Sequence, residues 1–321
     1  MTMDNNDPLI TIGIACYNAG DTVSRAIKSA LAQDWSNLDV VIVDDASADD
    51  TAAIAEKLIA GHAHARLIRH AKNAGPGGVR QTIINNARGD FVAFFDDDDE
   101  SAPQRVRKQY DRITAYEKET GVNLIACYAS GIRIYPNGYK VPLSAIGSQP
   151  GVPHGPAVVD YLLLNERHGN IFYGSGTPSC SLMARTETFK SSGGFDPALR
   201  RAEDIDFAVR LAMKGGHFIG CAEPLFTQYA TNAADKAPEK NLSGELSIAE
   251  KHKDYLQSIH RYDYATIWPT IRYYHFKRQH GKMAFALGRL FIKHPLKTSC
   301  HFLRSAPRRL IHEIKMKKSP Q

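Results

Sequence analysis

Short apolar segments alternate with amphipathic segments through the N-terminal third of this chain. The apolar segments read LITIGIA, LDVVIVD, ARLIR and DFVAFF, and each is followed by polar residues or a turn. Between them, segments such as DTVSRAIKSALAQ and DDTAAIAEKLIAG repeat their apolar residues at helical spacing. Because strands that alternate with helices build parallel sheets, the sequence predicts an α/β fold in which a mostly parallel, twisted sheet is flanked by helices.

Polar clusters follow three of the predicted strands, at the end where each strand stops. They are Tyr17 and Asn18 after the first strand, Asp44 and Asp45 after the second, and Asp96, Asp97, Asp98 and Asp99 after the fourth. Open parallel sheets bind ligands beyond the carboxyl ends of their strands. We therefore expect these side chains to face one cleft.

The acidic run, residues 96–99, is costly for the chain because like charges so close together repel one another unless a cation lies among them. Carboxylates at a strand end are typical ligands of Mg²⁺ or Mn²⁺, which also bind substrate phosphates. An ordinary acidic turn or a helix cap is the alternative interpretation. The second acidic pair, Asp44 and Asp45, follows the neighbouring strand and favours the metal site.

A glycine cluster, NAGPGGVR at residues 73–80, precedes a predicted helix. Glycines let the backbone approach a ligand, a helix N-terminus favours anions, and the planar guanidinium of Arg80 suits a diphosphate. The segment matches neither the G-x-G-x-x-G fingerprint nor a Walker loop, so simple turn chemistry is the alternative.

Two acids, Glu203 and Asp204, begin the predicted helix EDIDFAVRLAMKGG. Acids in a first helical turn usually only complement the helix dipole. In a cleft, however, such a carboxylate can act as a general base.

The composition is that of an ordinary soluble globular protein, with 321 residues of which 43% are hydrophobic and 23% charged. Its five cysteines lie far apart and predict neither a zinc site nor a disulfide framework. The N-terminal residues do not resemble a signal peptide, and no apolar run is long enough to span a membrane. We expect a cytoplasmic protein, with peripheral contact to the inner face of the cell membrane.

The basic charge is concentrated in the C-terminal tail. From residue 271 onward there are about 13 Lys or Arg residues and one acid, so the tail carries roughly +12 and the rest of the chain roughly −6, which together give the net charge of +6. Interspersed Leu, Phe and Ile allow basic amphipathic helices, broken at Pro295 and Pro307, that suit an anionic membrane surface. A packing arm or an oligomer contact is the alternative. Nucleic acid is not expected, because the aromatic residues form no stacking platform.

Four segments resemble the family 2 glycosyltransferases with a GT-A fold. They are ITIGIACYN, VVIVDDASADDT, NAGPGGVRQTIINNARGDFVAFFDDDDESAP and GGFDPALRRAEDIDFAVRLAMKGG, in this order and spacing, and the resemblance covers residues 8–223. It implies metal-assisted, inverting transfer of a sugar from a nucleotide-sugar, here expected to be a UDP-sugar, to an acceptor hydroxyl. The sequence lacks the Gln-x-x-Arg-Trp motif of processive members, so we expect transfer of a single sugar, in synthesis of a bacterial surface polysaccharide or a lipid-linked glycan.

The resemblance also implies the roles of individual residues. Asp204 matches the catalytic base and Glu203 its usual neighbour, while Asp45 is expected to accept the imino proton of the nucleotide base. The full set of expected nucleotide-binding residues is Ala15, Tyr17, Asn18, Asp44, Asp45, Asn73, Gly78, Arg80, Asp96 and Asp97.

The metal, Mn²⁺ or Mg²⁺, is expected at Asp98 and Asp99. The family pattern aligns Asp96 and Asp98 with the metal motif and places Asp99 beside it. Because Asp97 fills the variable position with another carboxylate, the register leaves open which of Asp98 and Asp99 touches the metal.

Three regions are expected along the chain: residues 1–105 as the nucleotide-sugar-binding half of a GT-A domain, 106–226 as its acceptor-binding half, and 227–321 as a basic helical extension. Relatives close over the diphosphate with Arg, His and Ser, whereas LFTQYATNAADK offers only Lys236 as a weak substitute. Two alternatives remain: a nucleotidyltransferase, although its Gly-rich Thr-Arg loop is missing, and a non-catalytic nucleotide-sugar-binding scaffold at the membrane.

Overall fold

The structure is a computed structural model that describes residues 7–230 and 237–303. Lys236 and the part of the predicted basic tail beyond residue 303 lie outside the described residues. Among the helices within these ranges, none combines the length and the apolar character needed to cross a bilayer.

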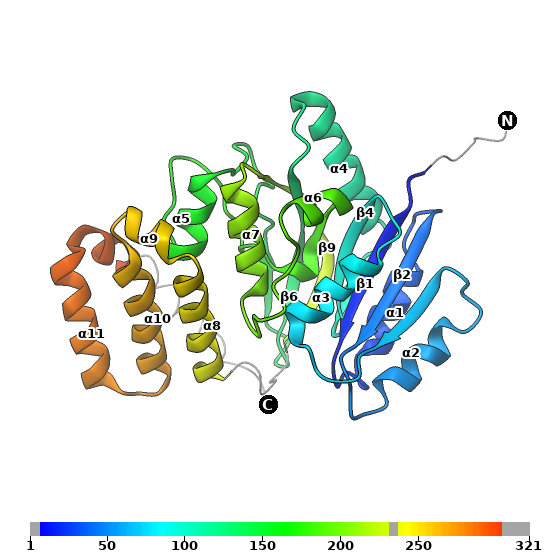
Figure 1. The fold of residues 1–321 in the computed structure, drawn as a ribbon, viewed down its shortest axis with the longest axis horizontal. Coiled ribbons are helices and arrows are strands. Elements are labelled where there is room, and N and C mark those ends of the chain that lie inside the picture. The colour runs from blue at the N-terminus through cyan, green and yellow to red at the C-terminus, as the bar shows by residue number, and fades with distance from the viewer. Residues whose placement is uncertain (1–6, 231–236, 304–321) are drawn as a thin grey trace. The chain divides into compact units, whose positions relative to one another are not determined.

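Helices and strands alternate along most of the chain (Figure 1). From the N-terminus the elements are β1 (Ile10–Cys16), α1 (Val23–Leu31), β2 (Leu38–Asp44), α2 (Thr51–Ile59), β3 (Ala65–Arg69), α3 (Gly75–Asn86), β4 (Phe91–Asp96), β5 (Asp99–Ser101), α4 (Arg105–Thr120), β6 (Ile125–Ile134) and β7 (Lys140–Leu143). They continue with α5 (Pro156–Leu164), the 3₁₀ turn η1 (Ser179–Ser181), β8 (Leu182–Arg185), α6 (Thr186–Ser191), α7 (Glu203–Met213), β9 (His217–Tyr229), α8 (Pro238–Lys251), α9 (Lys253–Ser258), α10 (Tyr262–Phe276) and α11 (His280–Lys293).

The sheet has the strand order β3-β2-β1-β4-β8-β6-β9-β5, with β7 paired to β6. Strands β3, β2, β1 and β4 are parallel, as are β6 and β9, whereas β8 is antiparallel to both of its neighbours and β5 is antiparallel to β9. This architecture confirms the predicted fold class, a mostly parallel α/β sheet flanked by helices.

The core is built on both faces of the sheet because its central strands are apolar on both sides. On one face, Ile12 and its neighbours in the strands pack against apolar residues of α1, α2 and α4. On the other face, Phe94 packs edge-on against Phe189 in α6. Here α3 approaches β1 so closely that a Cβ on Gly13 would lie 2.2 Å from Cγ2 of Ile83. The absence of a side chain at Gly13 therefore sets the height of the glycine-rich helix above the sheet.

The chain divides into two compact units. The first comprises residues 1–134, 141–159 and 167–229 and holds the sheet, and the second comprises residues 135–140, 160–166 and 230–321. Apolar residues of α9, α10 and α11, with Leu164, form the core of the second unit. The boundaries after residues 105 and 226, which were predicted to separate the two halves of the GT-A domain and the basic extension, stay predictions.

Candidate active site

The predicted strand-end clusters lie together at the carboxyl edge of the first unit's parallel strands. Register places Cys16 of β1 beside Asp44 of β2, and Ala15 of β1 beside Asp96 of β4. The backbone N–H of Tyr17 donates a hydrogen bond to Oδ2 of Asp97 at 2.9 Å, so the loop after β1 is joined directly to the acidic run.

Asp45 organises the glycine-rich segment that begins α3. Its buried carboxylate accepts hydrogen bonds from the backbone N–H groups of Ala74 (2.7 Å) and Gly75 (2.8 Å), and Nδ1 of His70 lies 2.7 Å away. Gly75 has a φ of +77°, a conformation that favours glycine. The side chain of Asn73 donates to the carbonyl of Asp45. The carboxylate of Asp45 thus already has three hydrogen-bond donors, from His70, Ala74 and Gly75.

The other member of the pair, Asp44, uses only one of its two carboxylate oxygens for a hydrogen bond within the described residues. Its Oδ2 accepts a hydrogen bond from the N–H of Ser47 at 3.3 Å. Its Oδ1 is buried and has no hydrogen-bond partner among the residues that the structure describes. A buried acceptor without a partner is costly, so a donor from a ligand would stabilise this site.

The acidic run forms a tight turn between β4, which ends at Asp96, and β5, which begins at Asp99. Only 5% of Asp99 is exposed, and both of its carboxylate oxygens lack a hydrogen-bond partner within the described part of the chain. Asp96, Asp99 and Cys180 offer ligand atoms that all lie within 4.8 Å of one another. The carboxylate oxygens of Asp96 and Asp99, unlike the thiol of Cys180, are ligands that fit a hard divalent cation, which would also satisfy the oxygens of Asp99.

The pKa values of the acidic run also favour a bound cation. Burial raises the pKa of Asp97 to about 8, and the charges of Asp98 and Asp96 add to the effect. Burial and the charge of Asp96 also raise the pKa of Asp99. A cation bound among these carboxylates would favour their charged forms and offset the repulsion.

Arg80 of α3 lies between the acidic run and the start of α7. Its Nη2 donates to Oδ1 of Asp96 at 2.9 Å, and its Nη1 forms an ion pair with Oε1 of Glu203. The guanidinium side chain is 8% exposed and its Nε has no partner among the described residues. Both terminal nitrogens are therefore occupied by carboxylates, and the contact of Arg80 with a diphosphate stays a prediction.

Asp204 belongs to the same charged cluster. Helix α7 begins at Glu203, directly after Ala202, whose φ is +62°. Burial raises the pKa of Asp204 to about 7, the charge of Glu203 adds to this rise, and Arg80 opposes it. An aspartate with a pKa near neutrality is suited to exchange a proton with a substrate.

Several residues at the site were not predicted from the sequence. Nη2 of Arg25 in α1 donates to the carbonyl of Asp98 at 2.6 Å, and Nη1 of Arg200 donates to Oδ1 of Asn73 at 2.6 Å. The charge of Asp204 contributes to a raised pKa of the buried Tyr128. Arg25 and Tyr128 lie outside the four segments that carry the family resemblance, and Arg200 lies within the fourth, but tertiary folding alone brings all three to the site.

The match to a known family agrees with this geometry. The sequence model described as Glycosyl transferase family 2 matches residues 11–172, about half of the chain. The chain belongs to glycosyl transferase family 2. This result confirms the predicted family and the predicted class of enzyme, a glycosyltransferase.

Two relatives illustrate how much of this family 2 glycosyltransferase is shared. Succinoglycan biosynthesis protein ExoO of Rhizobium meliloti is 41% identical over 116 residues, which are 36% of this chain and 33% of ExoO. The putative colanic acid biosynthesis glycosyl transferase WcaA of Escherichia coli is 27% identical over 257 residues, 78% of this chain and 83% of WcaA. The aligned part thus spans only a third of ExoO but most of WcaA.

A solved structure of S. aureus TarS in complex with UDP-GlcNAc shares the fold of this glycosyltransferase. The two structures align with a TM-score of 0.60 at 19% identity, over 88% of this chain and 80% of that one. At this level of identity the likeness extends to the fold alone.

A stability measurement tests the repulsion within the acidic run. Asp97→Asn is expected to raise the Tm of the ligand-free protein, because it removes a half-buried, repelled charge and keeps an acceptor for the N–H of Tyr17. The folded-state pKa is about 8 against an ordinary value of 3.8, so the gain should be largest above pH 8 and should disappear near pH 4. Scanning calorimetry across this pH range measures it. An unchanged Tm at high pH, equal to that of the exposed control Asp111→Asn on α4, would contradict the expected repulsion.

Proposed function

We propose that this protein transfers a single sugar from a nucleotide-sugar to an acceptor hydroxyl, with inversion at the anomeric carbon. The observation that carries the proposal is the Arg80 bridge, which joins the strand-end carboxylate Asp96 to Glu203, the neighbour of Asp204. A donor-binding edge and an acid capable of proton transfer are thereby held in one buried cluster. A UDP-sugar is the expected donor, which is supported by the complexes of TarS with UDP and UDP-GlcNAc.

The nucleotide is proposed to lie against the loop after β1 and the ends of β1 and β2. Tyr17 is 52% exposed and offers a ring face for the base. Asp44 or Asp45 would accept a hydrogen bond from the imino N–H of the base. The family resemblance favours Asp45, whereas Asp44 has a buried oxygen without a partner among the described residues. Of the remaining members of the predicted set, Ala15, Asn18, Asn73 and Gly78 would line the nucleoside, and Arg80, Asp96 and Asp97 would lie nearer the diphosphate.

A divalent cation, Mn²⁺ or Mg²⁺, is proposed at the acidic run. Asp98 and Asp99 are the proposed ligands, and the two oxygens of Asp99 that lack partners support this choice. When bound, the metal neutralises charge on the leaving diphosphate.

The proposed reaction is one in-line displacement. The acceptor oxygen forms a bond to the anomeric carbon while the bond from that carbon to the diphosphate oxygen breaks, and the nucleoside diphosphate leaves. Asp204 takes the proton from the acceptor hydroxyl, since its pKa of about 7 allows both the ionised and the protonated form near neutral pH. Arg80 positions α7 through Glu203. A single displacement from the face opposite the leaving group inverts the configuration.

The acceptor is proposed to be a glycan of a bacterial surface polysaccharide, either free or linked to a lipid. Support comes from the names of ExoO and WcaA, which refer to succinoglycan and colanic acid biosynthesis. The proposed place of action is the inner face of the cell membrane, contacted through the basic C-terminal region.

A donor screen tests the proposal. Purified protein is incubated with a panel of nucleotide-sugars in the presence of Mn²⁺, Mg²⁺ or chelator, and release of nucleoside diphosphate is measured. We expect one class of donor to be hydrolysed slowly with metal and not with chelator. Formation of nucleoside triphosphate and sugar 1-phosphate when pyrophosphate is added would instead support a nucleotidyltransferase, and binding without any turnover would support a scaffold.

The metal assignment is tested by donor affinity. Asp98→Ala and Asp99→Asn are expected to weaken donor binding in the presence of Mn²⁺ by about tenfold or more, and to leave the weaker binding in chelator unchanged. Titration calorimetry measures both, with the exposed Asp111→Ala on α4 as control. Wild-type affinity that is the same with Mn²⁺, Mg²⁺ and chelator would rule out the proposed metal.

A further inference from the structure

One face of α11 (His280–Lys293) carries large apolar side chains that lie open to solvent. Phe285 is 71% exposed and Ile292 is 84% exposed, whereas Ala286 and Leu290 on the opposite face are buried in the core of the second unit. Phe285 and Ile292 are seven residues apart, a spacing that places both on the same side of a helix. The exposed residues therefore form a stripe and are not scattered.

Two more exposed apolar side chains follow α11, after an interruption of the helix at His294. Residues 295–303 are again helical, and Leu296 and Leu303 are 83% and 71% exposed. With Phe285 and Ile292 they are the four most exposed large apolar side chains of the described chain. We call these four residues the apolar stripe. So many exposed apolar side chains within one short segment indicate an interaction surface.

The charge beside the apolar stripe is positive. Lys282 and Arg289 alternate with Phe285 and Ile292 at intervals of three or four residues, which places all four on one side of α11. The sequence of residues 280–303 contains no Asp or Glu. An anionic partner is therefore favoured over a neutral one.

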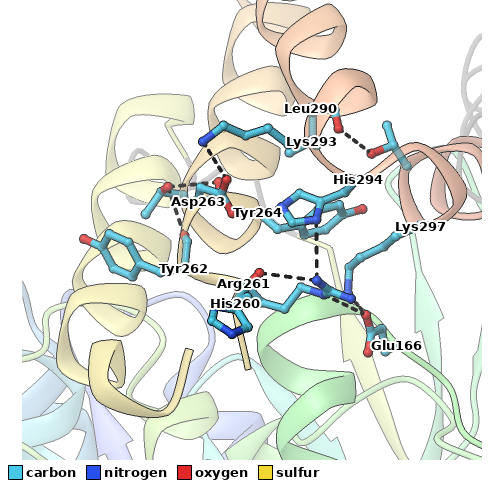
Figure 2. A network of polar contacts seen from close by, with 12 residues as sticks. Glu166, His260, Arg261, Tyr262, Asp263, Tyr264, Leu290, Lys293, His294 and Lys297 are labelled. Atoms are coloured by element: carbon cyan, nitrogen blue, oxygen red, sulfur yellow. Dashed lines mark hydrogen bonds and ion pairs between the residues drawn. The ribbon is translucent and has the colours of Figure 1, made fainter. Parts of the chain in front are cut away.

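Lys282 and Arg289 also differ from the other basic residues nearby. Figure 2 shows Lys293 and Lys297 directed at acids of the second unit, and Nζ of Lys293 lies 2.9 Å from Oδ2 of Asp263. Within the described residues, the ion pairs of this region involve neither Lys282 nor Arg289. Their charges remain available to a partner.

A recess of about 490 Å³ opens next to the apolar stripe. Its lining includes Lys282, Phe285 and Arg289 from α11 and the hydroxyl-bearing residues Thr270 and Tyr274 from α10. Two cations, hydroxyl donors and an apolar rim match a phosphate head group with its adjoining acyl chains. The ammonium group of Lys282 lies 5.9 Å from the ring centre of Tyr274, at the wall of this recess.

We infer that the apolar stripe is a docking surface for an anionic phospholipid bilayer. Its four apolar side chains enter the boundary between head groups and acyl chains, and Lys282 and Arg289 contact lipid phosphates. Docking of a second copy through the same face is disfavoured, because it would bring these like charges together. The inference deepens the membrane contact of the proposed function, but it depends on no donor, metal or acceptor.

Vesicle sedimentation with the full chain tests the inference. We expect the protein to bind vesicles made of equal parts phosphatidylglycerol and phosphatidylcholine and to remain in solution with phosphatidylcholine alone. Lys282→Glu combined with Arg289→Glu should weaken binding by about 30-fold or more, and raised salt should weaken binding of the wild type. Phe285→Ser combined with Ile292→Ser should weaken binding by a similar factor.

Matched controls change the same residue types elsewhere. Lys57→Glu combined with Lys118→Glu, on α2 and α4, makes the same change in net charge, and Met213→Ser removes an exposed apolar side chain from α7. Both controls should bind as the wild type does. Equal weakening by the control pair, or equal wild-type binding to both kinds of vesicle, would overturn the inference. So would a wild-type dimer that becomes monomeric in Phe285→Ser/Ile292→Ser while vesicle binding persists. A protein that docks but hydrolyses no nucleotide-sugar would contradict the proposed function alone.

Discussion

Asp204→Asn is expected to lower kcat by about 10²–10⁴-fold, the usual contribution of a positioned general base. Asn has nearly the shape of Asp and preserves an acceptor for the N–H of Ile205, but it cannot take the proton of the acceptor hydroxyl. The affinity for the donor, measured by titration calorimetry with Mn²⁺, should change little, since the lost interaction is with the acceptor. Steady-state kinetics with the donor found in the screen gives kcat.

The pH profile of the wild type separates a general base from a structural acid. A base must be ionised, so kcat should fall as the pH drops through the raised pKa of about 7, and by about tenfold per pH unit below it. Asp254→Asn, an acid in the first turn of α9, is the matched control and should retain full activity. If Asp204→Asn retained most of its turnover, or if the wild-type rate were flat down to pH 5, another group would have to accept the proton.

Arg80→Ala is expected to lower the free energy of unfolding by about 3 kcal/mol and to abolish turnover. The substitution leaves the carboxylates of Asp96 and Glu203 without their shared partner, and removing one partner of a buried ion pair is strongly destabilising. Urea denaturation of the ligand-free protein measures the stability. The exposed pair of Arg107 with Asp34 provides the control, because Arg107→Ala should cost less than about 1 kcal/mol.

A second variant keeps the Arg80 prediction testable if the single variant folds poorly. Arg80→Ala combined with Glu203→Gln removes one of the two stranded charges and should recover part of the lost stability without recovering turnover. Equal stability of Arg80→Ala and Arg107→Ala would mean that the Arg80 bridge does not hold the two halves of the site together.

The sequence was sufficient to predict the parallel part of the sheet. Strands β1, β2 and β4 are buried on both faces, so they appear as unbroken apolar segments, and their polar ends must share one edge once the strands are parallel. The strand pattern therefore predicts Tyr17, Asp44 and Asp96 at one edge of the sheet. A strand is also predicted within SCSLMART, where β8 lies, but the pattern predicts neither its antiparallel pairing nor the strand β5, because short strands leave little periodic signal.

The contacts that connect the two sides of the site are long-range and lie beyond sequence patterns. Arg80 and Glu203 are 123 residues apart, and nothing in either segment encodes their pairing. Similarly, the tail was predicted to be basic and amphipathic, but only the structure separates Lys293, paired with Asp263, from Lys282 and Arg289, which retain their charge at the surface. The ion pairs formed in the folded structure therefore determine which of the basic side chains are already neutralised.

In the proposed function, one cluster of charged residues holds a nucleotide-sugar between the acidic run and Asp204. Diffraction from crystals grown with UDP and Mn²⁺ tests it most directly, since the anomalous signal locates the manganese. We expect the manganese at Asp98 or Asp99, the uracil beside Tyr17 and the pair Asp44 and Asp45, and the carboxylate of Asp204 facing the open end of the diphosphate. Well-ordered UDP bound away from these residues, with no manganese at the acidic run, would contradict the account.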